Sequence, residues 1–440
     1  MFPKARKALQ SILQYSYPLE KQSLKPGPPT AYLLVPDGPS GTNTKAALPV
    51  AKALRDGGTP CLVLSNSHVT VETMTKAGIE AVQLPTMFTG FAGLVADIKA
   101  TGLVNTWIRG RRGLLGSAFD QNFYYLDQNM PRYITIADAI QKACRKIFAR
   151  RRPTVFLTLT ETHPYCVAAA MEARDHGARW IGWLHMLIMD IPDYRHFPAD
   201  YHLFYGDHGK DIYSRCAVTP GPAMSIGSPL YDQAFGRAKD ADTAVVRRML
   251  PDWDGRPLIV VGTENRANQL VEITATLTAL RSLNNIHTVV KLHPDDDFKT
   301  FLELVTRLKL PPQRFAVVKD CDLDALLNAA DVLITTFSNI IINAAVLGTA
   351  VISHNYTNAF GVDFAAAAVG CKATSPEELL VLLTRLLGEP AFRTENVEAS
   401  RLAVRQFISE HGGRSATAIA QVMAALHSGD DDVFASGSRT

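Results

Sequence analysis

The stretch over residues 286–352 constrains the fold of this chain more than any other part of its sequence. Apolar, β-branched runs at residues 287–292, 315–318, 332–334 and 350–352 alternate with helical patterns at residues 301–308, 323–330 and 340–347. Strands that are apolar on both faces and are separated by helices indicate a parallel sheet covered on both sides. The sequence therefore predicts a doubly wound α/β domain in this half of the chain.

Polar residues follow two of these predicted strands, at the carboxyl edge where open α/β sheets bind ligands. The first group is His293 and Pro294; the second is Thr335, Thr336 and Ser338, directly before a helix expected to begin near Asn339. We expect the two groups on neighbouring strand ends, where the unpaired N–H groups of the helix and nearby hydroxyls can surround a phosphate. The alternatives are that Ser338 only caps the helix and that His293 is only a hydrogen-bonded histidine at a strand end.

The residues KLHP (Lys291–Pro294) and AADVLITTFSNIIINAAVLGTAVI (Ala329–Ile352) resemble the nucleotide-binding half of GT-B glycosyltransferases. The resemblance is closest to the bacterial surface-polysaccharide branch, which includes sialyltransferase-like enzymes and CDP-glycerol glycerophosphotransferases. It implies two Rossmann-like domains that face each other across a cleft. In those families the HP histidine and the Ser/Thr motif contact the donor's nucleotide and phosphate, so these roles fall on His293, Thr336 and Ser338. The first half of the chain resembles the families only in general layout.

A chain of 440 residues exceeds what one core usually serves, so we expect two domains. The parts are a basic arm (1–28), an acceptor-side Rossmann-like domain (29–235), a linker (236–255), a nucleotide-sugar-binding Rossmann-like domain (256–397), helices crossing back onto the first domain (398–427) and a disordered tail (428–440).

The net charge of +3 is too small to argue for nucleic acid, and the basic clusters lack interleaved aromatic residues. Scattered cysteines and the lack of a long apolar run or signal peptide predict a cytoplasmic protein.

The loop Asp37–Lys45 follows the first predicted strand and is rich in glycine and hydroxyl groups. It matches neither the dinucleotide-binding nor the P-loop pattern. GT-B enzymes use such a loop near the acceptor or the transferred sugar, which makes Asp37 a candidate catalytic base. The alternative is that Asp37 is a plain turn residue.

Glu161 and His163 follow a predicted buried strand in the first domain. A carboxylate and a histidine two residues apart are suited to acid/base chemistry. Glu161 could remove the proton of an acceptor hydroxyl, with His163 orienting it or binding phosphate; alternatively, Glu161 caps the next helix. The sialyltransferase-like families carry two acidic residues and a glycine in this domain, and that motif is not intact here, which leaves the base and the donor sugar open.

Two basic segments, Trp107–Gly116 and Cys144–Pro153, allow two interpretations. They are either solvated helix ends or a surface for a polyanionic or lipid-linked acceptor and for the inner membrane leaflet. With the basic arm, the second interpretation implies peripheral membrane contact at the cytoplasmic face.

The second domain opens with RPLIVVGTEN, in which Gly262, Thr263 and Glu264 follow a strand where the family's donor phosphates lie. A backbone N–H group in such a turn can bind an anion. The acidic residues Asp295–Asp297 are explained by the start of a helix, so no metal site is expected.

The resemblance implies a bacterial, nucleotide-sugar-dependent glycosyltransferase of polysaccharide biosynthesis, inverting and independent of metals and separate cofactors. The expected donor is an acidic sugar on CMP, with uridine as the second choice of nucleotide, and the acceptor is a surface glycan, a lipid-linked molecule or a protein. The alternatives are a CDP-glycerol-type phosphotransferase, a UDP-N-acetylglucosamine 2-epimerase and a non-catalytic scaffold. The epimerase would carry a histidine–arginine loop after Val261 and a glycine pair with glutamates after Ile334, where this chain has GTEN and TTFSN.

Overall fold

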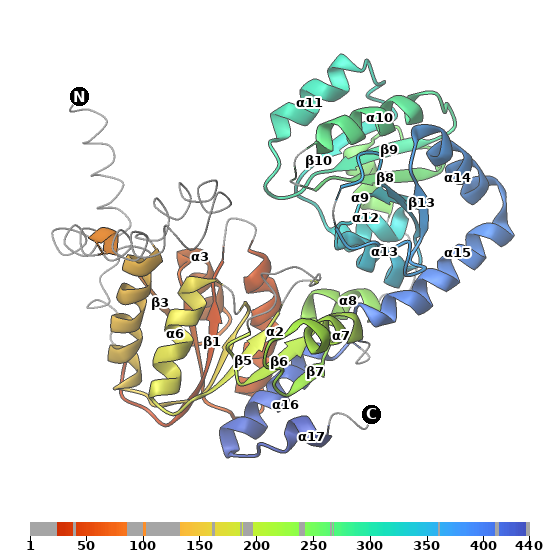
Figure 1. Ribbon diagram of the computed structural model, residues 1–440. Coiled ribbons are helices and arrows are strands. Elements are labelled where there is room, and N and C mark those ends of the chain that lie inside the picture. The colour runs from red at the N-terminus through yellow and green to blue at the C-terminus, as the bar shows by residue number, and fades with distance from the viewer. Residues whose placement is uncertain are drawn as a thin grey trace, which may run out of the picture.

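The protein folds into two α/β lobes, each built on a parallel sheet with helices on both faces (Figure 1). The computed structural model describes residues 24–37, 41–85, 100–102, 133–160, 163–184, 187, 197–236, 243–264, 266, 268–359, 361–409 and 413–436. These two Rossmann-like lobes confirm the predicted GT-B architecture.

The sheet of the first lobe has the order β3-β2-β1-β4-β5-β6-β7. Its strands are β1 (Thr30–Val35), β2 (Cys61–Ser65), β3 (Ala81–Gln83), β4 (Pro153–Thr158), β5 (Arg179–Trp183), β6 (Tyr201–Phe204) and β7 (Ala223–Ser225). The connecting helices are α2 (Thr42–Asp56), α3 (His68–Lys76), a helix over residues 133–148, α6 (Pro164–Asp175) and α7 (Asp207–Cys216). The strand order reverses between β1 and β4, which pair in parallel.

Strand β1 shows why these sequences form buried parallel strands. All six of its residues are buried, and successive side chains enter opposite cores. Leu33 and Val35 belong to the core that includes α2, whereas Tyr32 and Leu34 belong to the core that includes α6. Because side chains alternate along a strand, a strand covered on both faces must be apolar throughout.

The sheet of the second lobe has the order β10-β9-β8-β11-β12-β13. Its strands are β8 (Leu258–Gly262), β9 (His287–Lys291), β10 (Phe315–Val318), β11 (Val332–Thr335), β12 (Ala350–His354) and β13 (Cys371–Ala373). The helices are α10 (Gln269–Arg281), α11 (Phe298–Arg307), α12 (Leu323–Ala329), α13 (Ile340–Leu347) and α14 (Pro376–Gly388). The expectation that the His293 and Ser338 groups follow neighbouring strands is wrong, because β8 lies between β9 and β11.

The chain passes between the lobes twice. It leaves the first lobe through α8 (Pro229–Gly236) and α9 (Thr243–Met249) and returns through α15 (Pro390–Ala403), the short helix η3 (Val404–Gln406) and α16 (Ser415–Ser428) (Figure 1). α16 packs against α2, β1 and β4, so it belongs to the first lobe. The carboxylate of Asp232 accepts hydrogen bonds from the backbone N–H groups of Ser415 at 3.1 Å and Ala416 at 3.2 Å, which caps α16.

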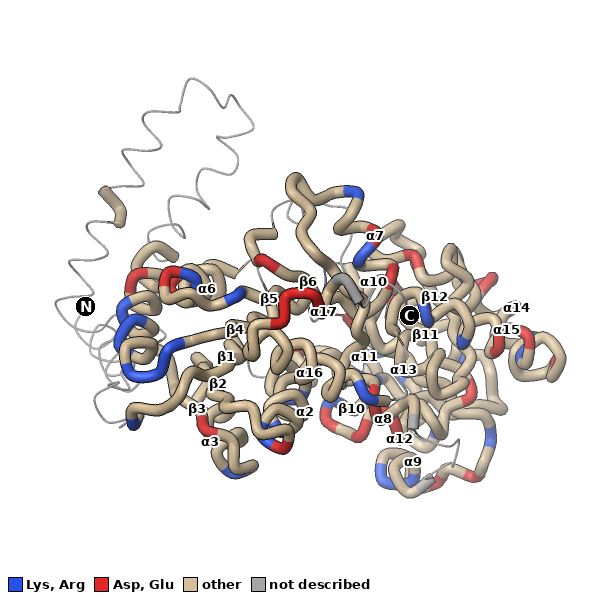
Figure 2. The backbone as a smooth tube through the Cα atoms, turned by 90° about the horizontal axis from the view of Figure 1, so that it is seen from below, with Lys and Arg blue, Asp and Glu red and all other residues tan. Residues whose placement is uncertain are grey.

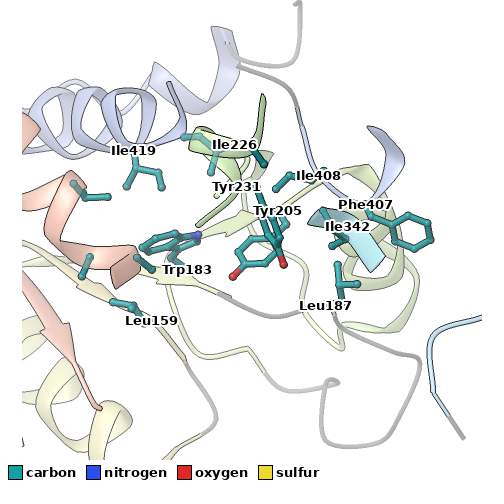
Figure 3. Close-up of a cluster of buried hydrophobic side chains, with 14 of the residues drawn as sticks. Leu159, Trp183, Leu187, Tyr205, Ile226, Tyr231, Ile342, Phe407, Ile408 and Ile419 are labelled. Carbon is teal, nitrogen blue, oxygen red and sulfur yellow. The ribbon is translucent and has the colours of Figure 1, made fainter. Parts of the chain in front are cut away.

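A buried apolar cluster fills the space where the crossings meet (Figure 3). Ile342 of α13 and Phe407 of the returning segment belong to this cluster together with Tyr205 and Tyr231 of the first lobe. The returning segment packs closely against Gly206, where any larger residue would clash, since a Cβ atom there would lie 2.6 Å from the carbonyl oxygen of Gln406. The two lobes are therefore joined by packed side chains as well as by the chain.

The expectation that residues 428–440 form a disordered tail is wrong for the part of the tail that the structure describes. Asp431 accepts hydrogen bonds from Arg179 at 2.8 Å and from Tyr201 at 3.0 Å. Phe434 in α17 (Val433–Ser436) is 8% exposed and stacks on Tyr201 with ring centroids 4.7 Å apart. Asp431 and Phe434 together hold this segment against the first lobe. Residues 437–440 lie outside the described residues.

No helix in the described part of the chain is both long and apolar enough to cross a membrane. All six cysteines are free thiols.

Candidate functional site

The loops after β8 and β11 meet where the strand order of the second sheet reverses. The hydroxyl of Thr335 donates a hydrogen bond to the carbonyl oxygen of Gly262 at 3.0 Å, which ties the two loops together. A Cβ atom on Gly262 would lie 2.3 Å from Cδ1 of Ile340, so glycine permits α13 to start close to β8. Open α/β sheets bind ligands in the crevice at this reversal, outside the carboxyl ends of the strands.

Helix α13 begins at this crevice without a side-chain cap. Its N-cap residue is Asn339, and no side chain hydrogen-bonds there, so the alternative in which Ser338 caps the helix is not observed. Ser338 is partly exposed, and its hydroxyl makes no hydrogen bond within the described part of the chain. The N–H groups of Ile341 and Ile342 donate to the carbonyl oxygens of Ser338 and Asn339 at 3.0 Å, whereas those of Asn339 and Ile340 make no hydrogen bond within the described part of the chain. These two N–H groups and the nearby hydroxyl are suited to an anion.

Thr335 and Thr336, which we predicted to reach a phosphate, turn their hydroxyls inward. The hydroxyl oxygen of Thr335 lies 3.2 Å from Oε1 of Glu264, and the hydroxyl oxygen of Thr336 lies 3.2 Å from Oε2 of Glu272. Both threonines are at most 4% exposed. The hydroxyl of Thr336 satisfies the buried carboxylate of Glu272, whereas the single proton of Thr335 is shared between the carbonyl oxygen of Gly262 and Glu264.

Arg266 joins these carboxylates, and the sequence analysis did not single it out. Its Nε atom lies 3.1 Å from Oε2 of Glu264, its guanidinium also pairs with Glu272, and its Nη2 atom donates to Thr336 at 2.9 Å. The guanidinium carbon lies 5.4 Å from the centroid of the Phe337 ring. Burial raises the pKa of Glu264, although the N–H group of Phe337 and Arg266 act in the opposite direction. The only sequence signal was one arginine between two glutamates.

His293 follows β9 at the carboxyl edge of the second sheet. Its Nδ1 atom accepts a hydrogen bond from the backbone N–H of Asp295 at 3.2 Å, so the proton of the neutral ring is on Nε2. The side chain is 39% exposed, and Pro294 is exposed in the same turn. Because β9, β8 and β11 are consecutive in the sheet, His293, Thr263 and Ser338 follow three adjacent strand ends.

The corresponding reversal in the first sheet lies between β1 and β4, whose loops carry Asp37 and His163. Oδ2 of Asp37 accepts hydrogen bonds from the N–H and the hydroxyl of Thr44 and, at 3.4 Å, from the hydroxyl of Thr70. The backbone N–H of Asp37 donates to Asn66 at 2.9 Å. Asp37 therefore has the structural role of holding the first turn of α2 against α3, and its role as a base stays a prediction.

His163 forms the N-cap of α6, where its Nδ1 atom accepts a hydrogen bond from the N–H of Tyr165 at 3.2 Å. Burial lowers the pKa of His163, which favours the neutral ring near pH 7. A neutral ring in this orientation donates through Nε2, so it can bind an oxygen atom but is not arranged to accept a proton. Glu161 lies outside the described residues, and its role as the base stays a prediction.

Charges from the two lobes come close to each other. Burial lowers the pKa of Lys291 at the end of β9, and the ammonium of Lys45 in the first turn of α2 contributes to the lowering. Lys45 belongs to the helix that follows β1 and Lys291 ends β9, so charges at the carboxyl ends of both sheets interact electrostatically.

The basic segment Cys144–Pro153 lies at the amino ends of the strands of the first sheet, where the chain enters β4 (Figure 2). Arg145 binds both carboxylate oxygens of Glu172 at 2.9 and 2.8 Å, and Arg151 binds Glu80 at 2.6 and 3.0 Å. These arginines have partners within the first lobe, away from the crevice. The segment Trp107–Gly116 and residues 1–23 lie outside the described residues.

Among the described residues, no group of three or more His, Cys, Asp and Glu side chains is arranged to hold a metal ion.

Neither a protein-family model nor a curated protein sequence matches this chain. Solved structures match over nearly its whole length. A glycosyltransferase from Rickettsia africae ESF-5 has 13% identity and a TM-score of 0.58, covering 90% of this chain and 99% of that one. Anabaena Alr3699/HepE in complex with UDP and glucose has 14% identity and a TM-score of 0.57, covering 90% and 99%. A UDP-N-acetylglucosamine 2-epimerase has 11% identity and a TM-score of 0.60, covering 92% and 97%.

These similarities show that the chain has the fold shared by GT-B glycosyltransferases and UDP-N-acetylglucosamine 2-epimerases. Sequence identities this low show the fold alone. The sialyltransferase-like and CDP-glycerol types that the HP and Ser/Thr motifs resemble stay predictions.

Proposed function

We propose that this protein is a glycosyltransferase that moves a sugar from a nucleotide-linked donor to an acceptor bound by the first lobe. The observation that carries this function is the uncapped start of α13 beside Ser338, at the reversal point of the second sheet. Hydrogen-bond donors at such a position suit the phosphate of a nucleotide.

The chemistry follows from where charge develops. When the bond between the sugar and the nucleotide breaks, negative charge grows on the leaving phosphate, so fixed donors stabilise the transition state more than the bound donor. The donors are the hydroxyl of Ser338, the Nε2–H group of His293 and the N–H groups of Asn339 and Ile340 at the start of α13. Glu161, or Asp37, removes the acceptor's proton, and closure of the lobes excludes water.

Two arguments address the nucleotide. The HP and Ser/Thr motifs resemble families with cytidine donors, whereas structures of similar fold contain UDP or UDP-glucose. We propose a pyrimidine nucleotide, either a CMP-linked acidic sugar or a UDP-linked sugar. The acceptor is a surface glycan, a lipid-linked molecule or a protein in polysaccharide biosynthesis.

A 2-epimerase is the second candidate, because a UDP-N-acetylglucosamine 2-epimerase shares the fold over 97% of its length. The two activities have different products. An epimerase interconverts two nucleotide sugars, whereas a transferase needs an acceptor for efficient release of nucleotide. Chromatography of UDP-N-acetylglucosamine incubated with the protein alone therefore distinguishes them.

The test begins with thermal shifts in the presence of CMP, CDP, UDP and GDP, of which a cytidine or uridine nucleotide should raise the melting temperature most. His293→Ala and Ser338→Ala should each lower turnover at least about tenfold, because each removes a donor to the leaving phosphate, while the fold persists. Asn284→Ala is the control, because Asn284 lies in the turn between α10 and β9, at the amino ends of the strands and away from the crevice. Stabilisation by none of the four nucleotides, or full turnover in both variants, would refute the assignment.

A further inference from the structure

Three consecutive aspartates follow the HP turn, and the structure gives the middle one a separate role. Asp297 accepts a hydrogen bond from the N–H of Thr300 at 3.1 Å and caps α11, as expected for a carboxylate at a helix start. Asp296 points inward instead and is 4% exposed. The sequence analysis assigned all three residues to the helix start, so it missed Asp296.

Every side-chain contact of Asp296 comes from a hydrogen-bond donor. Its Oδ2 atom accepts from the hydroxyl of Thr263 and, at 3.1 Å, from the backbone N–H of His293. Its Oδ1 atom accepts from Nε2 of Gln269 at 2.7 Å, and Oε1 of Gln269 accepts from the backbone N–H of Glu264 at 2.9 Å. The carboxylate thus links the loop after β8, the loop after β9 and the first residue of α10.

The direction of these hydrogen bonds is fixed at both ends. The N–H group of Glu264 can only donate, so the amide of Gln269 must turn its oxygen to Glu264 and its NH₂ group to residue 296. At the other end, the N–H group of His293 donates to the hydroxyl oxygen of Thr263 at 2.8 Å as well as to residue 296, so the hydroxyl of Thr263 turns its proton to residue 296. Residue 296 must therefore accept on both of its terminal atoms. Among side chains of this size, only a carboxylate can do so.

We infer that Asp296 is a positioning residue of the donor site, which holds the loops after β8 and β9 in one arrangement so that the side chain of His293 is directed to the leaving phosphate. This role rests on the proposed function. Asp296 does not touch the donor; it acts through Thr263, Gln269 and His293. Donors of this kind contribute to catalysis only when they are held in place, and a displacement of about 1 Å can cost about a hundredfold in rate.

A pair of substitutions tests the direction of the network. Asp296→Asn places an NH₂ group against the NH₂ group of Gln269, and Gln269→Glu places a second buried carboxylate against Asp296. In the double variant D296N/Q269E, the carboxylate introduced at position 269 can accept from the N–H of Glu264 and from the amide introduced at position 296. The oxygen of that amide can accept from Thr263 and His293. The double variant therefore restores every hydrogen bond and keeps the total charge.

We expect D296N to lower turnover about ten- to a hundredfold while the donor KM changes little, and D296N/Q269E to recover most of that turnover. Asp297→Asn is the control, because it removes a neighbouring carboxylate that has no contact with the site. Normal turnover in D296N, or a double variant no more active than the weaker single variant, would overturn the positioning role.

A second readout does not depend on activity. NMR of ¹⁵N-labelled histidine reports which ring nitrogen of His293 carries the proton; the Nε2–H signature should be weakened in D296N and restored in D296N/Q269E. An unchanged signature in D296N would contradict the inference. If the wild-type protein binds no nucleotide but the signature responds as expected, the proposed function fails and the positioning of His293 stands.

Discussion

Replacing Arg266 with methionine should destabilise the second lobe strongly. The side chain of Arg266 is 14% exposed and pairs with Glu264 and Glu272, whose side chains are 10% and 1% exposed. Methionine has a similar length but leaves both carboxylates buried without a cation. Removing one partner of a buried ion pair costs about 3–5 kcal/mol, because the remaining charge is not solvated. At about 2–4 °C per kcal/mol for a domain of this size, the melting temperature should fall by about 10 °C.

The loss should depend on pH in a defined direction. Without the guanidinium, the pKa of Glu264, which burial already raises, should rise further, and the pKa of Glu272 should rise above its value in the unfolded chain. A raised pKa in the folded state means that folding takes up protons, so the missing stability returns as the pH falls and is lost as the pH rises through the folded pKa. R266M should therefore be closer to wild type at pH 5 than at pH 8.

Differential scanning calorimetry of wild type, R266M and R266M/E272Q at both pH values measures these effects. The double variant should recover part of the stability, since it removes one of the two unpaired charges. Arg256→Met is the matched control in the same lobe: Arg256 pairs with Asp254 in an exposed bridge, 43% and 48% exposed, and its loss should change stability little. An R266M protein that melts like the control, or loses more stability at pH 5, would refute the reasoning.

Three further predictions concern other parts of the molecule. Glu161→Gln should abolish transfer but leave nucleotide binding near normal in calorimetric titration, because the base acts on the acceptor; full activity would discard Glu161 as the base. Asp232→Ala should lower the free energy of unfolding in urea by about 1 kcal/mol, because it removes the cap of α16; no loss would contradict this capping role. Gly262→Ala should cost about 1–3 kcal/mol and weaken nucleotide binding, since the added methyl group would displace Ile340 at the start of α13; wild-type affinity would exclude a nucleotide at this crevice.

Local elements of the second lobe follow directly from the sequence. The runs at 315–318 and 340–347 correspond residue for residue to β10 and α13. The reason is physical: a strand buried on both faces must be apolar throughout, and Gly348 ends α13 in the left-handed conformation that glycine favours. Such signals lie within a few residues of the element they define.

The arrangement of the site does not follow in the same way. Strand β8 precedes β9 in the chain but separates it from β11 in the sheet, and no local pattern encodes that order. Arg266 and Thr336 are 70 residues apart, so their hydrogen bond has no local sequence signature. Asp296 and Asp297 are adjacent and chemically identical, and only the fold decides that one is buried and the other caps a helix.

The position of α16 has a consequence for how the protein is made. A ribosome releases the strands of the first lobe early, but the helix that covers α2, β1 and β4 emerges only after the entire second lobe. Until then the surfaces that receive Ile419, Met423 and Leu426, all fully buried in the finished protein, remain exposed to water. The later-synthesised lobe can therefore mature first, and a gene fragment encoding only residues 24–236 should yield an aggregation-prone chain rather than an independent domain.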